Sequence, residues 1–148
     1  MNGYLVDTSI LSAFAPGRVD TLPDSSAEWF KENGDQLYIS SMSVAEIEKG
    51  IAKLLRSGSA KRAADLAMWL DAIEAGYDAH VLPFDRQVAR LAGRMDDAVT
   101  AKGRNPGLAD IIIAATAKAH DLTILTANER HFEALDVWYM NPFERLEE

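Results

Sequence analysis

The amino-acid sequence predicts a three-layer α/β domain in which helices cover both faces of a parallel sheet. Five short segments are nearly uniformly apolar, as expected for strands that are buried on both faces. Helical stretches lie between most of these segments along the chain. Strands that alternate with helices form a parallel sheet wrapped by those helices. A chain of 148 residues is long enough to bury a sizeable core, so we expect one domain over residues 1–148.

Each predicted strand centres on a short apolar run. The strands lie near residues 3–7, 36–40, 79–84, 122–126 and 136–140. Four helices are predicted near residues 43–56, 60–75, 86–102 and 107–120. In the first of these helices, apolar residues recur at the spacing of one helix face, namely Val44, Ile47, Ile51 and Leu54.

Composition narrows the class of protein. The formal net charge is −8, from 15 Lys plus Arg against 23 Asp plus Glu, which argues against a general basic surface for nucleic acid. A nucleic-acid enzyme stays compatible, because acidic sites that hold divalent cations present positive charge to phosphate. The absence of cysteine excludes disulfides and thiolate metal sites. No stretch approaches the roughly 20 apolar residues of a membrane span, and no positive residue precedes the first apolar run. We therefore expect a cytoplasmic protein that does not bind membranes.

Polar and acidic residues follow three of the predicted strands. Asp7 closes the first strand, Glu46 stands in the first turn of the helix after the second, and Asn128 follows the fourth. In a parallel sheet, a strand's carboxyl end and the next helix's amino end share one edge, where α/β proteins bind ligands. Asp110, near the start of the helix 107–120, joins this edge if that helix runs in the common direction. We expect these four side chains to face one cleft.

Helix capping offers a local explanation for each of these residues. Two patterns, Ser43-x-x-Glu46 and Thr126-x-x-Glu129, fit capping boxes. Asp110 complements a helix dipole, and Asp7 could cap a short helix that follows it. Capping does not explain why the surroundings are so apolar, since Asp110 is followed by the run Ile111–Ala115.

Three carboxylates in one cleft suggest a divalent metal. Clustered carboxylates repel one another, and their pKa values rise unless a cation neutralises them. Hard oxygen ligands without cysteine, and without a histidine pair at metal spacing, select Mg²⁺ or Mn²⁺ over zinc. Such ions support phosphoryl transfer. Asp7, Glu46 and Asp110 therefore favour metal-dependent phosphodiester hydrolysis.

The same residues resemble the motifs of the PIN-domain ribonucleases, specifically the VapC-type toxins of bacterial toxin–antitoxin pairs. Asp7, in Leu5-Val6-Asp7-Thr8-Ser9, resembles the first metal-binding Asp of that family. Glu46, in Ser43-Val44-Ala45-Glu46, resembles its Glu, and Asp110, in Ala109-Asp110-Ile111-Ile112, resembles its second Asp. Thr126-x-Asn128-x-x-His131-Phe132 resembles the motif after the fourth strand. The four motifs occur in the family's order and span nearly the whole chain.

The resemblance implies a five-stranded parallel sheet and an endoribonuclease that depends on Mg²⁺ or Mn²⁺. Asp7, Glu46 and Asp110 would hold the metal. Asn128 would be a further catalytic residue that acts by hydrogen bonding. Thr8 or Ser9 would also form supporting hydrogen bonds and would contact the substrate. The resemblance also implies a homodimer and a cognate antitoxin that occupies the active-site cleft.

The chain departs from the family pattern in the last motif. Relatives often carry a further acidic residue at the place of Asn128 or of His131, and here neither is acidic. A second metal site would then be weak, or would form only with an RNA phosphate present. His131 could ligate a metal or contact phosphate, although a lone histidine on a short helix is more often a surface residue.

Basic and aromatic residues outside these motifs have open interpretations. A row of basic residues could lead RNA phosphates towards Asp110, or could be a solvated face paired with Asp96 and Asp97; it comprises Arg86, Arg90, Arg94, Lys102 and Arg104. Arg104 is the best single candidate for substrate contact. Trp29, Trp69 and Met68 could line a groove for an antitoxin segment, but their helical spacing favours core or dimer contacts.

Two other functions fit part of the pattern. The chain could be a PIN-fold binding module with weak catalysis that acts through an antitoxin-like partner. It could also be a phosphatase that uses Asp7 as nucleophile, but that pattern requires a second Asp where Ser9 stands.

Overall fold

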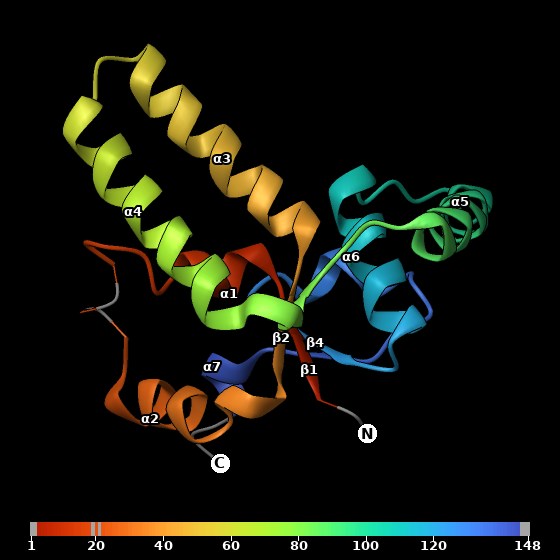
Figure 1. Ribbon diagram of the computed structural model, residues 1–148. Helices are drawn as coiled ribbons and strands as arrows, with labels where there is room; N and C mark the ends of the chain where they lie inside the picture. Colours follow the sequence, from red (N-terminus) through yellow and green to blue (C-terminus); the bar gives the residue numbers. More distant parts are fainter. Residues whose placement is uncertain (1–2, 19, 21, 146–148) are drawn as a thin grey trace.

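The computed structural model describes residues 3–18, 20 and 22–145 and contains a five-stranded parallel sheet (Figure 1). Its strands are β1 (Tyr4–Val6), β2 (Leu37–Ser40), β3 (Val81–Leu82), β4 (Thr123–Leu125) and β5 (Tyr139–Met140). Their spatial order is β3-β2-β1-β4-β5, and every neighbouring pair is parallel. All five predicted strands are confirmed, each somewhat shorter than the apolar run that predicted it.

The four predicted helices are also confirmed, to within a few residues at their ends. They are α3 (Ser41–Arg56), α4 (Ala60–Tyr77), α5 (Arg86–Ala101) and α6 (Leu108–Ala119). The structure adds α1 (Thr8–Ser12), α2 (Asp24–Glu32) and α7 (Pro142–Arg145), and the short 3-10 turns η2 (Gly34–Gln36), η3 (Asp78–His80) and η4 (Glu129–His131). Of these additions, the short helix after Asp7 and the short helix that carries His131 were anticipated from the sequence.

Alternation along β1 separates the two sides of the core. Leu5 belongs to a cluster with α5 and α6, whereas its neighbour Val6 belongs to a cluster with α1, α2, α3 and α4. Successive strand residues point to opposite faces of a sheet, so the helices form two layers around it. This arrangement confirms the three-layer prediction, and Figure 1 shows α5 and α6 on one side of the sheet.

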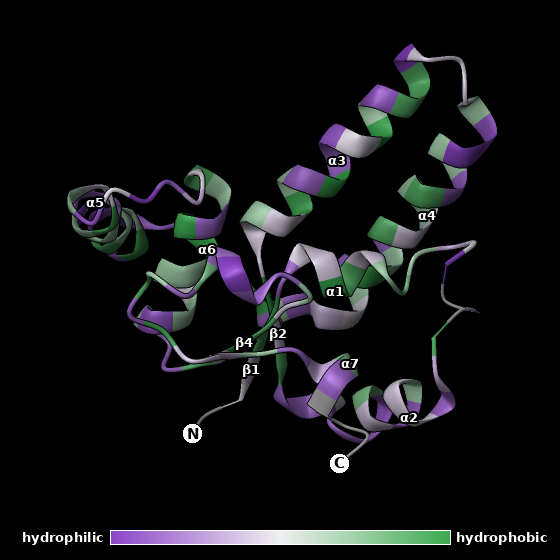
Figure 2. Cartoon of the chain, turned by 180° about the vertical axis from the view of Figure 1, so that it is seen from behind, coloured by the Kyte–Doolittle hydropathy of each residue, from purple (hydrophilic) through white to green (hydrophobic). Residues whose placement is uncertain are grey.

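Helices α3 and α4 form a hairpin that extends beyond the sheet (Figure 1). Hydrophobic and polar residues alternate along both helices, as Figure 2 shows by colour, and the apolar residues Ile47, Ile51, Ala63 and Leu70 are buried. Helix α6 differs, because all of residues 111–117 are buried. Within the described part of the chain, no helix has both the length and the apolar character needed to cross a membrane.

Candidate active site

Residues from four parts of the chain converge on one cleft of about 640 Å³ at the carboxyl edge of the sheet. Seven of the eight residues singled out from the sequence line it: Asp7, Thr8, Ser9, Glu46, Asp110, Asn128 and His131. The register explains the convergence, because Val6 lies opposite Leu125 and the backbone N–H of Asp7 donates to the Leu125 carbonyl at 2.9 Å. The eighth residue, Arg104, lies outside the cleft and lines a neighbouring hollow.

Asp7 is the buried anchor of the cleft, with only 4% of its surface exposed. One carboxylate oxygen, Oδ1, accepts from the Thr8 backbone N–H at 2.9 Å and thereby caps α1. The other, Oδ2, accepts from the Ser9 hydroxyl at 2.9 Å and from the Thr126 hydroxyl at 2.7 Å. These three donors fix the orientation of the carboxylate. The capping interpretation of Asp7 is confirmed, and it coexists with a place in the cleft.

Thr126 is a site residue that the sequence analysis assigned to a different role. Its fully buried hydroxyl donates to Asp7 and accepts from the Asn128 backbone N–H at 2.9 Å. The N-cap of η4 is Asn128, so the predicted capping box that begins at Thr126 is wrong. The available signal was position: Thr126 ends the β4 apolar run at the same edge as Asp7.

Glu46 stands deeper in its helix than the sequence suggested. Helix α3 begins at Ser41, and its N-cap is Ser40, whose hydroxyl accepts from the Met42 backbone N–H at 3.0 Å. The predicted capping box from Ser43 to Glu46 is therefore wrong, and Glu46 lies in the second turn. Strand β2 passes directly into α3 without a loop, which moves the helix start upstream of Ser43.

The Glu46 carboxylate joins α3 to α1 through Thr8. The Thr8 hydroxyl donates to Glu46 Oε1 at 2.7 Å, and its oxygen lies 2.8 Å from the hydroxyl oxygen of Ser43. Ser43 is fully buried at this junction. Sequence patterns did not identify Ser43 as a site residue, because its hydroxyl also fits a helix cap.

Asp110 is the third residue of α6, as the sequence predicted for a first turn. The chain enters α6 through Gly107, whose φ of 104° favours glycine. The pKa of Asp110 is raised from 3.8 to about 6: burial raises it most, His131 opposes the rise, and the charges of Asp7 and Glu46 add to it. Asp7 and Glu46 line the same cleft as Asp110, and their charges are two of the causes of its raised pKa.

His131 contacts Asp110 rather than being a surface residue alone. Its Nδ1 lies 3.1 Å from Asp110 Oδ2, while about half of the histidine side chain stays exposed. The same residue lines the cleft together with Asn128. A histidine therefore occupies the place beside Asp110 at which the sequence analysis noted the missing fourth acid.

The donor set of the cleft suits a hard divalent cation in kind. Asp7, Glu46 and Asp110 offer carboxylate oxygens. The charges of Asp7 and Glu46 raise the pKa of Asp110, and a cation bound among the three acids would neutralise those charges. Each carboxylate is hydrogen-bonded to a neighbour, and no three Asp, Glu or His side chains of residues 3–18, 20 and 22–145 lie close enough to form a metal shell. The carboxylate oxygens are of the kind that Mg²⁺ or Mn²⁺ prefers, but the three side chains do not lie close enough to one another to surround an ion.

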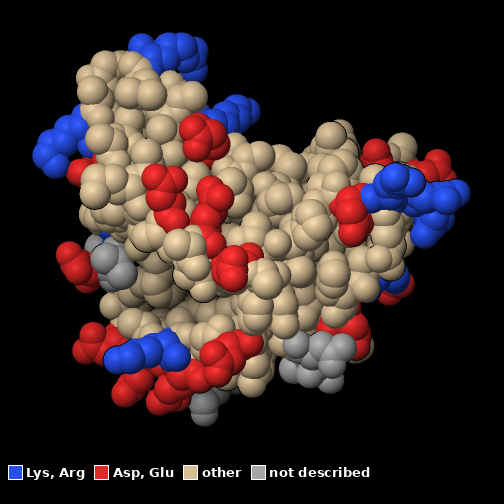
Figure 3. Space-filling model, viewed as in Figure 1, with Lys and Arg blue, Asp and Glu red and all other residues tan. Residues whose placement is uncertain are grey.

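The remaining sequence candidates fall into two groups. Arg86, Arg90 and Arg94 are exposed on α5, and in the described residues none forms an ion pair with Asp96 or Asp97. Their exposure agrees with a solvated face, whereas the expected pairing with Asp96 and Asp97 is wrong for these three arginines. On the face seen in Figure 3, Lys and Arg gather at the tip of the α3–α4 hairpin and over α5, whereas Asp and Glu dominate between and below them.

The aromatic candidates take separate roles. Trp29 packs edge-to-face against Tyr4 and Phe30, which confirms a core contact. Trp69 is half-buried and lines a groove of about 410 Å³ beside α1, α3 and α4. Met68 is 72% exposed and belongs to neither set.

Comparison with known proteins identifies relatives over most of the chain. The PIN domain family matches residues 4–137. The protein named Toxin FitB from Neisseria gonorrhoeae is 33% identical over 109 residues, which are 74% of this chain and 77% of that protein. VapC ribonuclease Y4jK from Sinorhizobium fredii is 32% identical over 111 residues, with the same two shares. The crystal structure of FitAcB from Neisseria gonorrhoeae superposes with a TM-score of 0.79 at 31% identity, covering 94% of this chain and 97% of that one.

Proposed function

This chain belongs to the PIN domain family, and on that premise we propose that it is an endoribonuclease dependent on Mg²⁺ or Mn²⁺, acting as the toxin of a toxin–antitoxin pair. The observation that carries the proposal is the convergence of Asp7, Glu46 and Asp110 on one cleft, with the pKa of Asp110 raised partly by the other two acids. The names of the relatives, a toxin and a VapC ribonuclease, support it.

In this proposal Asp7, Glu46 and Asp110 hold the divalent ion. When bound, such an ion polarises a phosphodiester and activates water for its hydrolysis. The residues around the acids set their orientation: Ser9 and Thr126 fix Asp7, and Thr8 fixes Glu46. Hydroxyl donors therefore orient Asp7 and Glu46 before any ion binds, which lowers the cost of arranging charge around a phosphate.

The open side of the cleft faces the substrate in this proposal. Asn128 is exposed and its amide can bond a phosphate or sugar oxygen, while His131 lines the cleft beside Asp110. Thr8 and Ser9 approach the same space from the Asp7 side, and Arg104 stands next to it. RNA is thus contacted by neutral and basic groups while the acids hold the metal.

We further propose a cognate antitoxin, a homodimer and a cytoplasmic location for this chain, taken as one domain over residues 1–148. The relative named as a toxin and the solved structure named FitAcB support the partner. The groove lined by Trp69 shares Thr8, Ser12, Arg18 and Glu46 with the cleft, so an antitoxin seated there would reach the acids.

A second candidate function is a catalytically weak PIN-fold module that acts through its partner. One observation favours it: in the described chain no metal shell is formed and each of the three acids has a neighbouring hydrogen-bond donor. A module of this kind would gain no stability from Mn²⁺ or Mg²⁺. The proposed nuclease would be stabilised by either ion, because binding to the folded state alone raises its stability.

The test is cleavage of RNA by the purified chain, free of its partner, with Mn²⁺ or Mg²⁺. We expect cleavage that stops when EDTA is added. Asp7→Asn and Asp110→Asn should each lower the rate by about 100-fold or more, since each removes a charge that holds the metal. Asp71→Asn is the matched control, because Asp71 is exposed on α4 and lies outside the cleft. Full activity in either cleft variant would contradict the site assignment.

A further inference from the structure

A second hollow, of about 340 Å³, lies beside the acidic cleft. We call it the arginine hollow, and its lining residues are Arg104, Asn105, Pro106, Arg130, His131 and Ala134. Pro106 and His131 line the acidic cleft as well, so the two hollows share a wall. We propose that the arginine hollow binds a phosphate of the RNA strand next to the phosphate that is cleaved, which rests on the nuclease function proposed above.

The charge of the arginine hollow is opposite to that of its surroundings. The chain carries a net charge of −8, yet the described residues that line this hollow include two arginines and no carboxylate. The four other hollows described in the structure each contain at least one Asp or Glu. A polyanion is repelled by most of such a molecule, so a local positive site beside the acids decides where its backbone rests.

Both arginines are available to a phosphate. Arg130 is exposed and forms no ion pair within the described part of the chain. Arg104 faces Glu133 at 3.7 Å, with about half of each side chain exposed. An exposed pair at that distance is weak, whereas a guanidinium can bind a phosphate through two parallel N–H donors. A phosphate would therefore displace Glu133 from Arg104.

The backbone around the arginine hollow is held in place before any ligand arrives. The Lys102 ammonium donates to the Ala134 carbonyl at 3.0 Å, which ties the segment before α6 to the segment after η4. The Arg104 backbone N–H donates to the Val99 carbonyl at 3.1 Å at the end of α5. The two arginines come from these two segments, which the Lys102 contact links.

The position of Arg130 favours RNA over an acidic protein segment as the occupant. Arg130 directly precedes His131, whose Nδ1 lies 3.1 Å from Asp110 Oδ2. Adjacent Cα atoms are about 3.8 Å apart, so the side chain of Arg130 begins one residue from the histidine that contacts Asp110. RNA repeats its phosphates at even spacing, so a strand whose scissile phosphate lies at Asp110 can place a neighbouring phosphate in the adjoining arginine hollow. A protein segment has no such repeat of charge.

Binding of a defined RNA without cleavage tests this proposal. The probe is a fluorescein-labelled single-stranded RNA of mixed sequence, measured by fluorescence anisotropy in EDTA over a range of NaCl concentrations. We expect Arg104→Ala and Arg130→Ala each to raise Kd by about 5- to 10-fold and to lower the slope of log K against log salt by about 0.7. Compared with Arg130→Ala, Arg130→Lys should restore the salt slope more than the affinity. Lysine keeps the positive charge but cannot donate two parallel N–H groups to a phosphate.

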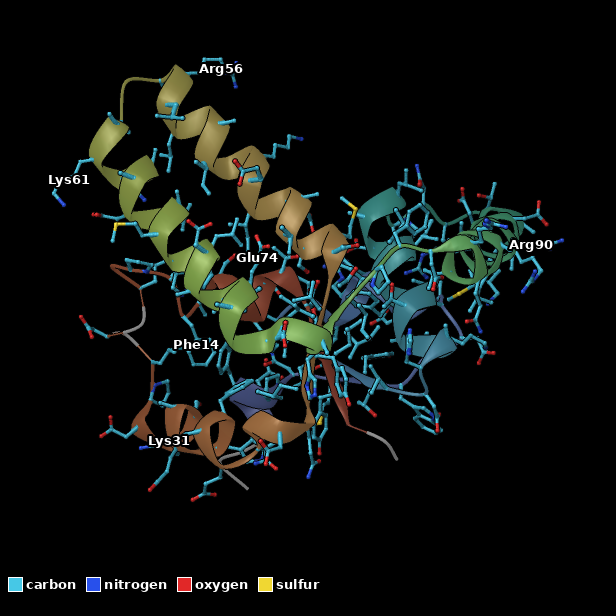
Figure 4. The ribbon with its side chains drawn as sticks, viewed as in Figure 1. Phe14, Lys31, Arg56, Lys61, Glu74 and Arg90 are labelled. Atoms are coloured by element: carbon cyan, nitrogen blue, oxygen red, sulfur yellow. The ribbon has the colours of Figure 1, made fainter. Side chains whose placement is uncertain are left out.

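Arg56→Ala is the matched control. Arg56 ends α3 at the tip of the hairpin and points away from the rest of the chain (Figure 4). The binding test requires no variant of the acidic cleft. Unchanged thermal midpoints show that the two arginine variants are folded. Kd values and salt slopes equal to those of Arg56→Ala would overturn the proposal, and would leave an acidic partner segment as the ligand to examine. A wild-type chain that binds no RNA at any salt concentration would overturn it as well.

Cleavage assays separate this proposal from the function on which it rests. If the wild type cleaves RNA with Mn²⁺ and the arginine variants bind and cleave as it does, the arginine hollow alone is rejected. If the wild type binds RNA through the two arginines and never cleaves it, phosphate binding by the hollow stands and the nuclease function is rejected. With both correct, Arg130→Ala should raise KM for RNA and change kcat little.

Discussion

The two sides of the cleft differ in how they hold their acids. Asp7 is buried and accepts three hydrogen bonds from groups next to it on α1 and at the end of β4. Asp110 has a pKa of about 6, raised by burial and by the charges of Asp7 and Glu46, and its ion-pair contact is His131. The Asp7 side is fixed by the fold, whereas the Asp110 side stores repulsion that a cation would relieve. A site built in this way has one rigid anchor and one acid that responds to the ligand.

The largest expected effect comes from breaking the rigid side. Thr126→Val keeps the shape of the side chain and removes the hydroxyl that donates to Asp7 and accepts from the Asn128 N–H. We expect the free energy of unfolding to fall by about 1–3 kcal/mol, because buried polar groups lose their partner. Urea denaturation in EDTA measures this change.

Thr116→Val is the control for that substitution. Thr116 is also fully buried, but its hydroxyl donates to the Ile112 carbonyl within α6, which the helix itself can satisfy. We expect its cost to be well below that of Thr126→Val. Equal costs for the two variants would show that Thr126 has no special part in holding Asp7.

A smaller effect of opposite sign is expected on the other side of the cleft. Because the folded chain raises the pKa of Asp110 from 3.8 to about 6, it binds more protons than the unfolded chain between these values. Stability therefore falls as pH rises through that window, and the loss is complete above pH 6. We expect Asp110→Asn to be more stable than the wild type by on the order of 1 kcal/mol at pH 7 without divalent ions, after discounting for solvent screening.

The pH dependence sharpens this second prediction. The advantage of Asp110→Asn should shrink as the pH falls towards 4, since the wild-type carboxyl is then protonated in the folded chain. Thermal unfolding at several pH values measures it, with Asp71→Asn as the exposed control. If Asp110→Asn were more stable than the wild type by the same amount at every pH, or less stable at pH 7, the proposed repulsion at Asp110 would be contradicted.

Sequence patterns predicted the parts of this molecule that depend on periodicity and position along the chain. The five strands and four long helices follow from apolar spacing, and Asp7, Glu46 and Asp110 meet because parallel strands end at one edge. Helix α2 was missed, although its Trp29 was assigned to the core on helical spacing alone.

Hydroxyl groups were the part that the sequence could not assign. Ser40, Ser41 and Ser43 all offer a plausible cap for α3, and only the direct passage from β2 into the helix selects Ser40. Thr126 fits a capping box equally well until Asp7 is placed beside it, 119 positions away in sequence. The contact between His131 and Asp110 has the same origin, because short-range patterns do not show which side chains meet across the sheet.

Counting bound Mn²⁺ by electron paramagnetic resonance tests the central claim most directly, namely that the three acids form a divalent-metal site. We expect the wild type to bind one ion per chain, Asp7→Asn and Asp110→Asn to lose that binding, and Asp71→Asn to keep it. A second ion should appear only when RNA is added, because Asn128 and His131 supply no further carboxylate. A wild type that binds no Mn²⁺, or cleft variants that bind it as tightly as the wild type, would contradict the account.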